Sequence, residues 1–343
     1  PIDSIGAILV LMIISIIPLL INRTEEKGVL LMYAKILILF IFGLAIYHLF
    51  YIKDNGKERL IKDLKIGIVI QFVIGILALL GMQWFIDLGL FSHTLMPRFY
   101  GSEQEYRLYN LTSSAFFQLS LFYLFLFHFL LAYDHQKHNL NPLFLFLLLC
   151  IGLISGRTFL LLSLISIIIY FKWRYLPALT AFSILILLLA IFIPEHKYVS
   201  HALEPLINLI SGAGRISSST DTLVNNHLFM PTLKQFIQGD GYYFQIDGHY
   251  YGMTDSGFLR QVLYGGGIYL LTCMLFTFYF IRKVALNWFN GSWRFIYSTF
   301  LILTICHIKA DTYAFPGLML VLLMFLSLFG KSGKQLSLWK GKQ

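Results

Sequence analysis

Arginines at the edges of apolar segments are the residues of this sequence best suited to bind a charged substrate. Arg157 lies at a turn between two short apolar stretches, 140–155 and 158–171. A guanidinium group can donate two parallel hydrogen bonds to phosphate oxygens, so we predict that Arg157 binds a phosphate or pyrophosphate. The alternative is that this side chain only extends to lipid headgroups, because a cation costs roughly 2.5–3.5 kcal/mol at the centre of a bilayer.

A second candidate anion site lies in the longest polar stretch of the chain, residues 194–256. Here Gly214 precedes Arg215, and the glycine allows the backbone to approach a ligand closely. An ordinary solvated loop is the alternative. Two further arginines can assist: Arg98 in an earlier loop, and Arg260 one helical turn into the apolar segment that follows the polar stretch.

Two groups that can accept a proton lie near the end of the polar stretch. Both His249 and Asp255 can take a proton from an attacking hydroxyl, so each is a candidate general base. Asp255 also stands at the expected start of a helix, where a capping role is the alternative. A histidine with nearby aspartates could bind a metal, but no third ligand follows at a standard spacing. We therefore predict no metal and no cofactor.

A glycine turn followed by aromatic residues lies in the same stretch, at Gly239-Asp240-Gly241 and Tyr242-Tyr243. Aromatic rings can stack on sugars, but they also mark membrane interfaces, and both interpretations remain open.

Charged residues near the C-terminal end carry no known catalytic motif. His307, Lys309 and Asp311 cluster at the last outer turn, where one interpretation is that Lys309 and Asp311 pair with each other.

The composition defines the elements that must position these residues. The chain has 343 residues, of which 58% are hydrophobic and only 13% are charged, whereas soluble domains have roughly 25% charged residues. Its apolar runs of about twenty residues match the roughly 30 Å hydrocarbon core of a bilayer. We predict an all-α polytopic membrane protein with a single integral membrane domain over 1–343, in which 194–256 forms one large loop.

Ten membrane spans are predicted. They lie at about 5–21, 29–51, 66–86, 113–133, 140–155, 158–171, 176–193, 257–281, 294–308 and 314–330. The alternative for 140–171 is one long helix. A turn at 155–157 places fifteen Lys and Arg residues on one side of the membrane and ten on the other. Cytoplasmic loops are rich in Lys and Arg, so the turn is favoured, both termini are expected in the cytoplasm, and 194–256 faces outward. The basic residues form no single patch, so no nucleic-acid partner is predicted.

Four short motifs follow one another between about residues 90 and 280. They are Arg98-Phe99-Tyr100-Gly101 with Asn110, Ser155-Gly156-Arg157-Thr158, Gly214-Arg215 with Gly239-Asp240-Gly241, and Asp255-Ser256-Gly257-Phe258-Leu259 with Gly265-Gly266-Gly267. In this order they resemble the motifs of the O-antigen polymerases and the related O-antigen ligases.

The resemblance implies a GT-C-like fold with a large periplasmic loop, in the inner membrane of a bacterium. Proteins of this family move a growing glycan from undecaprenyl pyrophosphate onto a lipid-linked repeat unit, and a chain-length regulator is a possible partner. Arg157 and Arg215 would hold the pyrophosphate with help from Arg260 or Arg98, and Asp255 or His249 would deprotonate the acceptor.

Two alternatives remain. An O-antigen ligase would transfer the glycan to lipid A–core, but ligases carry a histidine at the position that resembles Asp255. A transporter or flippase of lipid-linked solutes would typically show charges at the membrane midplane and an inverted repeat, whereas the charges here lie mainly at the outer edge.

Overall fold

The computed structural model describes residues 1–343 except 54, 139, 213, 215–216, 246 and 331–343. The described chain is all-helical and has no β-strand, only an isolated bridge between Phe244 and Tyr250. Within it, five helical segments are long and apolar enough to cross a membrane. They are α1 (Ile2–Asn22), α2 (Gly28–Ile46) continued by the π-helical η1 (Tyr47–Tyr51), α5 (Phe116–Lys137), η4 (Trp173–Tyr175) with α8 (Leu176–Phe192), and α13 (Gly257–Phe289).

The other five predicted spans also fall on helices, which are shorter or more polar, although the predicted span 66–86 is divided between two helices by a break at 80–82. They are α3 (Gly56–Leu79), α4 (Gln83–Phe91), α6 (Pro142–Ser155), α7 (Arg157–Ile169), α14 (Trp293–Lys309) and α15 (Leu318–Leu326). The start of α3 also differs from the prediction: the helix begins at Gly56, whereas the predicted span begins at about residue 66. The charged residues between these positions are mostly Lys, Arg and Glu, which are good helix formers, so the helix extends through the stretch that was predicted to be a loop.

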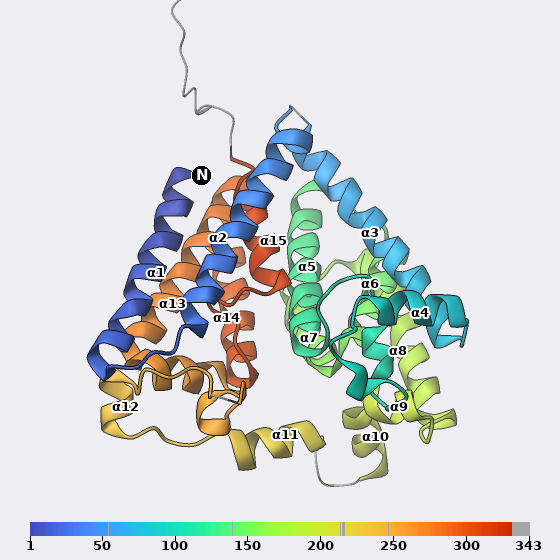
Figure 1. Cartoon of the computed structure of the whole chain (residues 1–343). Helices are drawn as coiled ribbons and strands as arrows, with labels where there is room; N and C mark the ends of the chain where they lie inside the picture. The colour runs from blue at the N-terminus through green and yellow to red at the C-terminus, as the bar shows by residue number, and fades with distance from the viewer. Residues whose placement is uncertain (54, 139, 213, 215–216, 246, 331–343) are drawn as a thin grey trace, which may run out of the picture.

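The polar stretch 194–256 folds into short helices at one end of the bundle. They are α9 (Lys197–Ala202), α10 (Glu204–Ser211), α11 (Ser218–Thr222), η5 (Leu223–His227), α12 (Leu233–Gln238) and η6 (Tyr251–Met253). Figure 1 shows α9 to α12 at the lower end of the molecule, whereas the N-terminus of α1 lies at the upper end. Two further turns, η2 (Pro97–Phe99) and η3 (Glu105–Leu108), belong to the loop between α4 and α5.

Helix α5 forms the centre of the bundle. Residues 119–134 are buried except Phe122, which is half-buried, because α6, α7, α13, α14 and α15 contact this helix. By contrast, α1 and α2 expose many aliphatic side chains, such as Ile13, Leu20, Leu31 and Ile38. Contiguous apolar surface of this kind is unusual on a soluble monomer and is typical of a lipid-facing helix.

A glycine separates α6 from α7, so the predicted turn within 140–171 is confirmed. Gly156 has φ 150° and ψ 163°, a conformation that L-residues rarely adopt. A Cβ atom at this position would lie 2.7 Å from both Arg107 Nη2 and Ser120 Oγ. The break places Arg157 in the first turn of α7.

A second break lies within α13, at Gly265 and Gly266, where the backbone leaves the helical region. The carbonyls of Leu263 and Tyr264 instead accept hydrogen bonds from the amides of Asp240 (2.7 Å) and Gly241 (3.0 Å). The predicted glycine turn therefore lies against this break. The break separates the first two turns of α13 from the long remainder of the helix.

Candidate functional site

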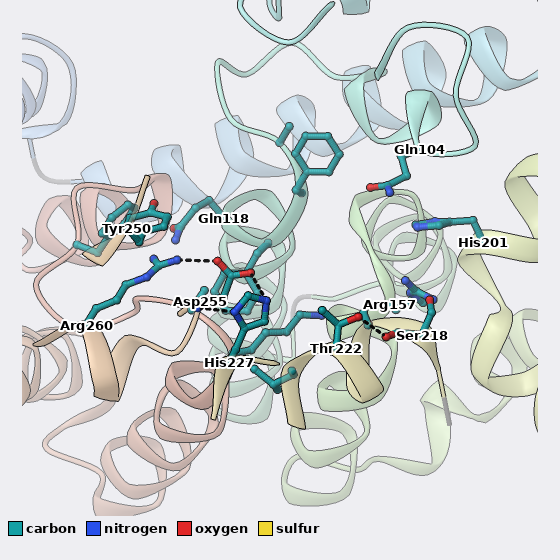
Figure 2. Close-up of a pocket in the computed structure, with 18 of the residues that line it drawn as sticks. Gln104, Gln118, Arg157, His201, Ser218, Thr222, His227, Tyr250, Asp255 and Arg260 are labelled. Atoms are coloured by element: carbon teal, nitrogen blue, oxygen red, sulfur yellow. Dashed lines mark hydrogen bonds and ion pairs between the residues drawn. The ribbon is translucent and has the colours of Figure 1, made fainter. Parts of the chain in front are cut away.

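A cavity of about 580 Å³ lies at the end of the bundle that carries the short helices. Its polar lining comes from segments that are far apart in the chain, and it includes Arg157, His201, His227, Asp255, Arg260 and Lys309. Figure 2 shows Arg260, Tyr250, Asp255 and His227 on one side, and Arg157, His201 and Ser218 on the other. Three predicted site residues, Arg157, Asp255 and Arg260, thus line the same cavity.

The wall around Arg157 is fixed by one carboxylate. Arg157 is 12% exposed and pairs with Glu204, the first residue of α10. Glu204 also accepts hydrogen bonds from the amide (2.8 Å) and the hydroxyl (3.1 Å) of Ser218. Although burial raises the pKa of Glu204, the Ser218 amide and Arg157 lower it on balance, so the carboxylate stays charged. This pair ties the start of α7 to the polar stretch.

Two further cations stand close to Arg157. Arg107 in η3 donates from Nε to the Ser155 carbonyl (3.2 Å), and its guanidinium lies 4.7 Å from the centre of the Phe116 ring. Lys309 is the last residue of α14, one position beyond the predicted span 294–308. Burial lowers the pKa of Lys309 to about 8, and the charges of Arg107 and Arg157 contribute to this shift.

The same positive charges also lower the pKa of the buried His201. Its Nδ1 lies 3.0 Å from the Tyr106 hydroxyl. Burial lowers the pKa of His201 to about 3, and Arg157, Arg107 and Lys309 contribute to this shift. The imidazole is therefore neutral at physiological pH and adds no charge of its own to this wall.

The opposite wall is built around Arg260, which is only 4% exposed. Its Nη1 donates to Asp311 Oδ2 (2.7 Å), its Nη2 to Asp255 Oδ1 (2.9 Å), and its Nε to the Thr254 carbonyl (2.9 Å). The guanidinium also stacks on the ring of Tyr250, 3.1 Å from the ring centre. Two carboxylates therefore share the charge of Arg260, which leaves it little capacity to attract an external anion.

The expected ion pair between Lys309 and Asp311 does not form, because Asp311 pairs with Arg260. The physical reason is local: α14 ends at Lys309, and Ala310 is fully extended with φ −164° and ψ 170°. Residues on either side of an extended residue can point in different directions from those they would take on a helix, so Lys309 lines the cavity while Asp311 is buried behind Arg260.

Asp255 presents an accessible carboxylate to the cavity and is 56% exposed. Ser256 holds the N-cap position of α13, so Asp255 does not cap this helix. Its Oδ2 lies 3.6 Å from Nε2 of His227, at the end of η5. The Thr254 hydroxyl donates to the His227 carbonyl (2.6 Å), which holds the two segments together. His227 is not among the predicted site residues, since a residue so far from Asp255 in the chain gives no local signal.

The remaining predicted residues lie elsewhere. His249 is outside the cavity lining; its amide bonds to Asp247 and its carbonyl accepts from the Gln245 amide. Arg98 is also outside the lining and stacks on Phe99, 4.7 Å from the ring centre.

The predicted glycines and the second arginine of the polar stretch have separate surroundings. Gly239 and Gly241 contact the break in α13, whereas a Cβ at Gly214 would meet no atom within 4 Å. Arg215 lies outside the described residues, so its distance from Arg157 is not defined. Among the residues that the structure describes, no group of three His, Cys, Asp or Glu side chains could hold a metal ion.

No protein-family model, no curated protein and no solved structure matches the chain. Function must therefore be argued from the chemistry of the cavity.

Proposed function

We propose that this protein is a membrane glycosyltransferase that polymerises an O-antigen or capsule-type polysaccharide. It would transfer the growing glycan from undecaprenyl pyrophosphate to a lipid-linked repeat unit at the periplasmic face of a bacterial inner membrane. The ten spans, the cytoplasmic termini and the outward-facing loop belong to this proposal. They are supported by the excess of Lys and Arg at the opposite end of the spans.

One observation carries the proposal: Arg157 and Asp255 line the same cavity at the loop-bearing end of the bundle. In the proposed step, the acceptor hydroxyl oxygen attacks the anomeric carbon, and the bond from this carbon to the diphosphate oxygen breaks. The diphosphate leaves with the bonding electron pair, and Arg157 would stabilise the negative charge that develops on it. Asp255 would receive the proton of the acceptor hydroxyl.

The rest of the lining suits a sugar substrate. Phe116, Phe117, Tyr250 and Phe315 provide aromatic surface, and Gln104, Gln118, Ser219 and Thr222 provide hydrogen-bonding groups. Ligand cavities commonly combine apolar and aromatic walls with a few polar groups that fix orientation.

A ligase activity is the second candidate, and His227 supports it. Ligases carry a histidine in the loop-exit motif, where this chain resembles the motif but has Asp255. The structure places His227 beside Asp255 from another part of the chain, which could supply the histidine that the motif lacks. The products separate the two activities: a strain without polymerase makes core capped with a single repeat unit, whereas a strain without ligase accumulates lipid-linked polymer.

Complementation of a polymerase-deficient strain tests the proposal. The wild-type gene should restore a ladder of glycan lengths, and Arg157→Ala should reduce polymer formation about a hundredfold or more, as loss of a transition-state donor does elsewhere. Arg98→Ala is the matched control, because this arginine lies outside the cavity lining. Membrane levels of each variant are compared by immunoblot. A normal ladder from Arg157→Ala at normal protein level would contradict the proposed role of Arg157.

A further inference from the structure

The cavity wall around Arg157 holds three cations, of which only Arg157 has an ion pair within the described part of the chain. Glu204 pairs with Arg157. Among the residues that the structure describes, Arg107 bonds only to uncharged acceptors, the Ser155 carbonyl and, at 3.5 Å, Gln104 Oε1. For Lys309, no carboxylate lies within ion-pair distance in the described part of the chain. The two acidic residues of the cavity lining, Glu103 and Asp255, form no ion pair with Arg107 or Lys309, so these two cations have no direct carboxylate partner among the described residues.

On the opposite wall, the protein itself supplies the opposite charge for a buried arginine. Arg260 is shared between Asp255 and Asp311. A partly buried cation without a partner is costly, since its desolvation is not offset by a nearby opposite charge. Such groups are concentrated where a ligand supplies the missing charge. The contrast between the two walls indicates that an external anion would be stabilised next to Lys309.

We propose that Lys309 and Arg157 form the contact surface of a diphosphate-binding site, to which Arg107 adds positive potential from behind Phe116. Lys309 and Arg157 line the cavity, whereas Arg107 touches the lining residues Gln104 and Phe116. The hydroxyls of Ser219 and Thr222 belong to the same lining and can donate to phosphate oxygens. This site rests on the proposed function for its natural ligand, a polyprenyl diphosphate, but its geometry does not depend on the transfer reaction.

The positive charge of this wall favours an anion that carries more than one negative charge. A single carboxylate has one negative charge, which could offset Lys309 but would leave the positive charge of Arg107 without an opposite charge. A diphosphate carries at least two negative charges and several acceptor oxygens, so it can bind the guanidinium of Arg157 and the ammonium of Lys309 at the same time.

Titration of the purified full-length protein with inorganic pyrophosphate, followed by calorimetry, tests the site. We expect wild-type protein to bind, Lys309→Met to bind about tenfold to a hundredfold more weakly, and Lys309→Arg to retain most of the affinity. Arg98→Met is the matched control and should bind like wild type. Equal affinity of Lys309→Met and Arg98→Met, or no binding by wild type, would overturn the proposal.

A second arm separates the diphosphate from the phosphates of lipid headgroups. The titration is repeated in nanodiscs of phosphatidylcholine alone and of phosphatidylcholine mixed with phosphatidylglycerol. Similar pyrophosphate affinity in both supports a diphosphate site. Loss of pyrophosphate binding in the anionic nanodiscs would assign the site to headgroups and overturn the proposal.

If Lys309→Met fails to fold, wild-type binding is measured in two buffers of different ionisation enthalpy at pH 8.5. Proton uptake on binding supports a role for Lys309, and its absence contradicts it.

The glycan ladder distinguishes this inference from the proposed function. Pyrophosphate binding that depends on Lys309, together with no ladder from the wild-type gene, would leave the anion site standing and refute the polymerase. A wild-type ladder, with unchanged pyrophosphate affinity in Lys309→Met, would refute the anion site alone.

Discussion

Arg260 and Asp311 form an ion pair that is almost sealed from solvent, with Nη1 and Oδ2 2.7 Å apart and exposed fractions of 4% and 0%. The pair joins the start of α13 to the segment between α14 and α15. Asp255 binds the other side of the same guanidinium but is 56% exposed. One arginine thus serves both as an internal support and as a positioning group for the carboxylate that faces the cavity.

Removal of Arg260 should therefore destabilise the protein far more than removal of its exposed partner. Arg260→Met leaves Asp311 buried without a cation, which typically costs about 3–5 kcal/mol. Asp255→Asn removes a largely solvent-exposed pair, which is worth about 0–1 kcal/mol. Thermal unfolding in detergent should show a much lower Tm for Arg260→Met than for Asp255→Asn. Similar values for the two variants would show that the buried pair does not support the fold.

Affinity for pyrophosphate should fall as the pH rises above 8. The pKa of Lys309 is lowered to about 8 by burial and by Arg107 and Arg157, while Asp255 and Cys306 oppose the shift. Lys309 is therefore protonated below pH 8 and loses its charge as the pH rises through that value. Since a bound anion stabilises the protonated form, affinity should drop about tenfold per pH unit above 8, until the pKa of the complex is reached.

The ligand itself cannot produce this trend, because pyrophosphate only gains negative charge as the pH rises. Lys309→Arg is the control, since arginine stays protonated throughout the range. Calorimetric titrations at pH 7, 8 and 9 measure the effect. A profile for Lys309→Arg that declines as steeply as wild type would assign the titration to another group.

The transfer rate should depend on Asp255 and not on His249. Asp255 faces the cavity, whereas His249 lies outside its lining. Asp255→Asn should slow glycan transfer about a hundredfold or more if Asp255 is the general base. His249→Ala should leave the rate unchanged. An in vitro assay with lipid-linked repeat units at several pH values tests both variants, and a wild-type pH–rate profile in Asp255→Asn would exclude Asp255 as the base.

Gly239 should tolerate alanine less well than Gly214, although both have positive φ, 72° and 70°. Alanine at either position incurs backbone strain, which is about 1–3 kcal/mol at Gly239, where ψ is −172°. At Gly239 the added Cβ would also lie 2.5 Å from the Tyr264 carbonyl oxygen, whereas at Gly214 it meets no atom within 4 Å. The drop in Tm should be clearly larger for Gly239→Ala. Equal drops would mean that the turn does not depend on its contact with α13.

The sequence predicted the helices well, since runs of apolar residues and a glycine at 156 determine them locally. The site could be predicted only in part. Arg157 and Asp255 were recognisable from their positions at segment ends, but their shared cavity depends on how α7 and α13 are placed around α5. Lys309 and Asp311 were misjudged because their spacing suggested a pair, whereas the extended backbone at Ala310 separates them.

The break in α13 has a consequence for chimaeric proteins. The carbonyls of Leu263 and Tyr264 accept hydrogen bonds from backbone amides within residues 239–241. These hydrogen bonds join the polar stretch to the first two turns of α13. A graft that replaced 194–256 alone would have to place two backbone amides where those of Asp240 and Gly241 lie, or the carbonyls of Leu263 and Tyr264 would lose their donors. The smallest interchangeable segment therefore extends from the polar stretch through Gly266.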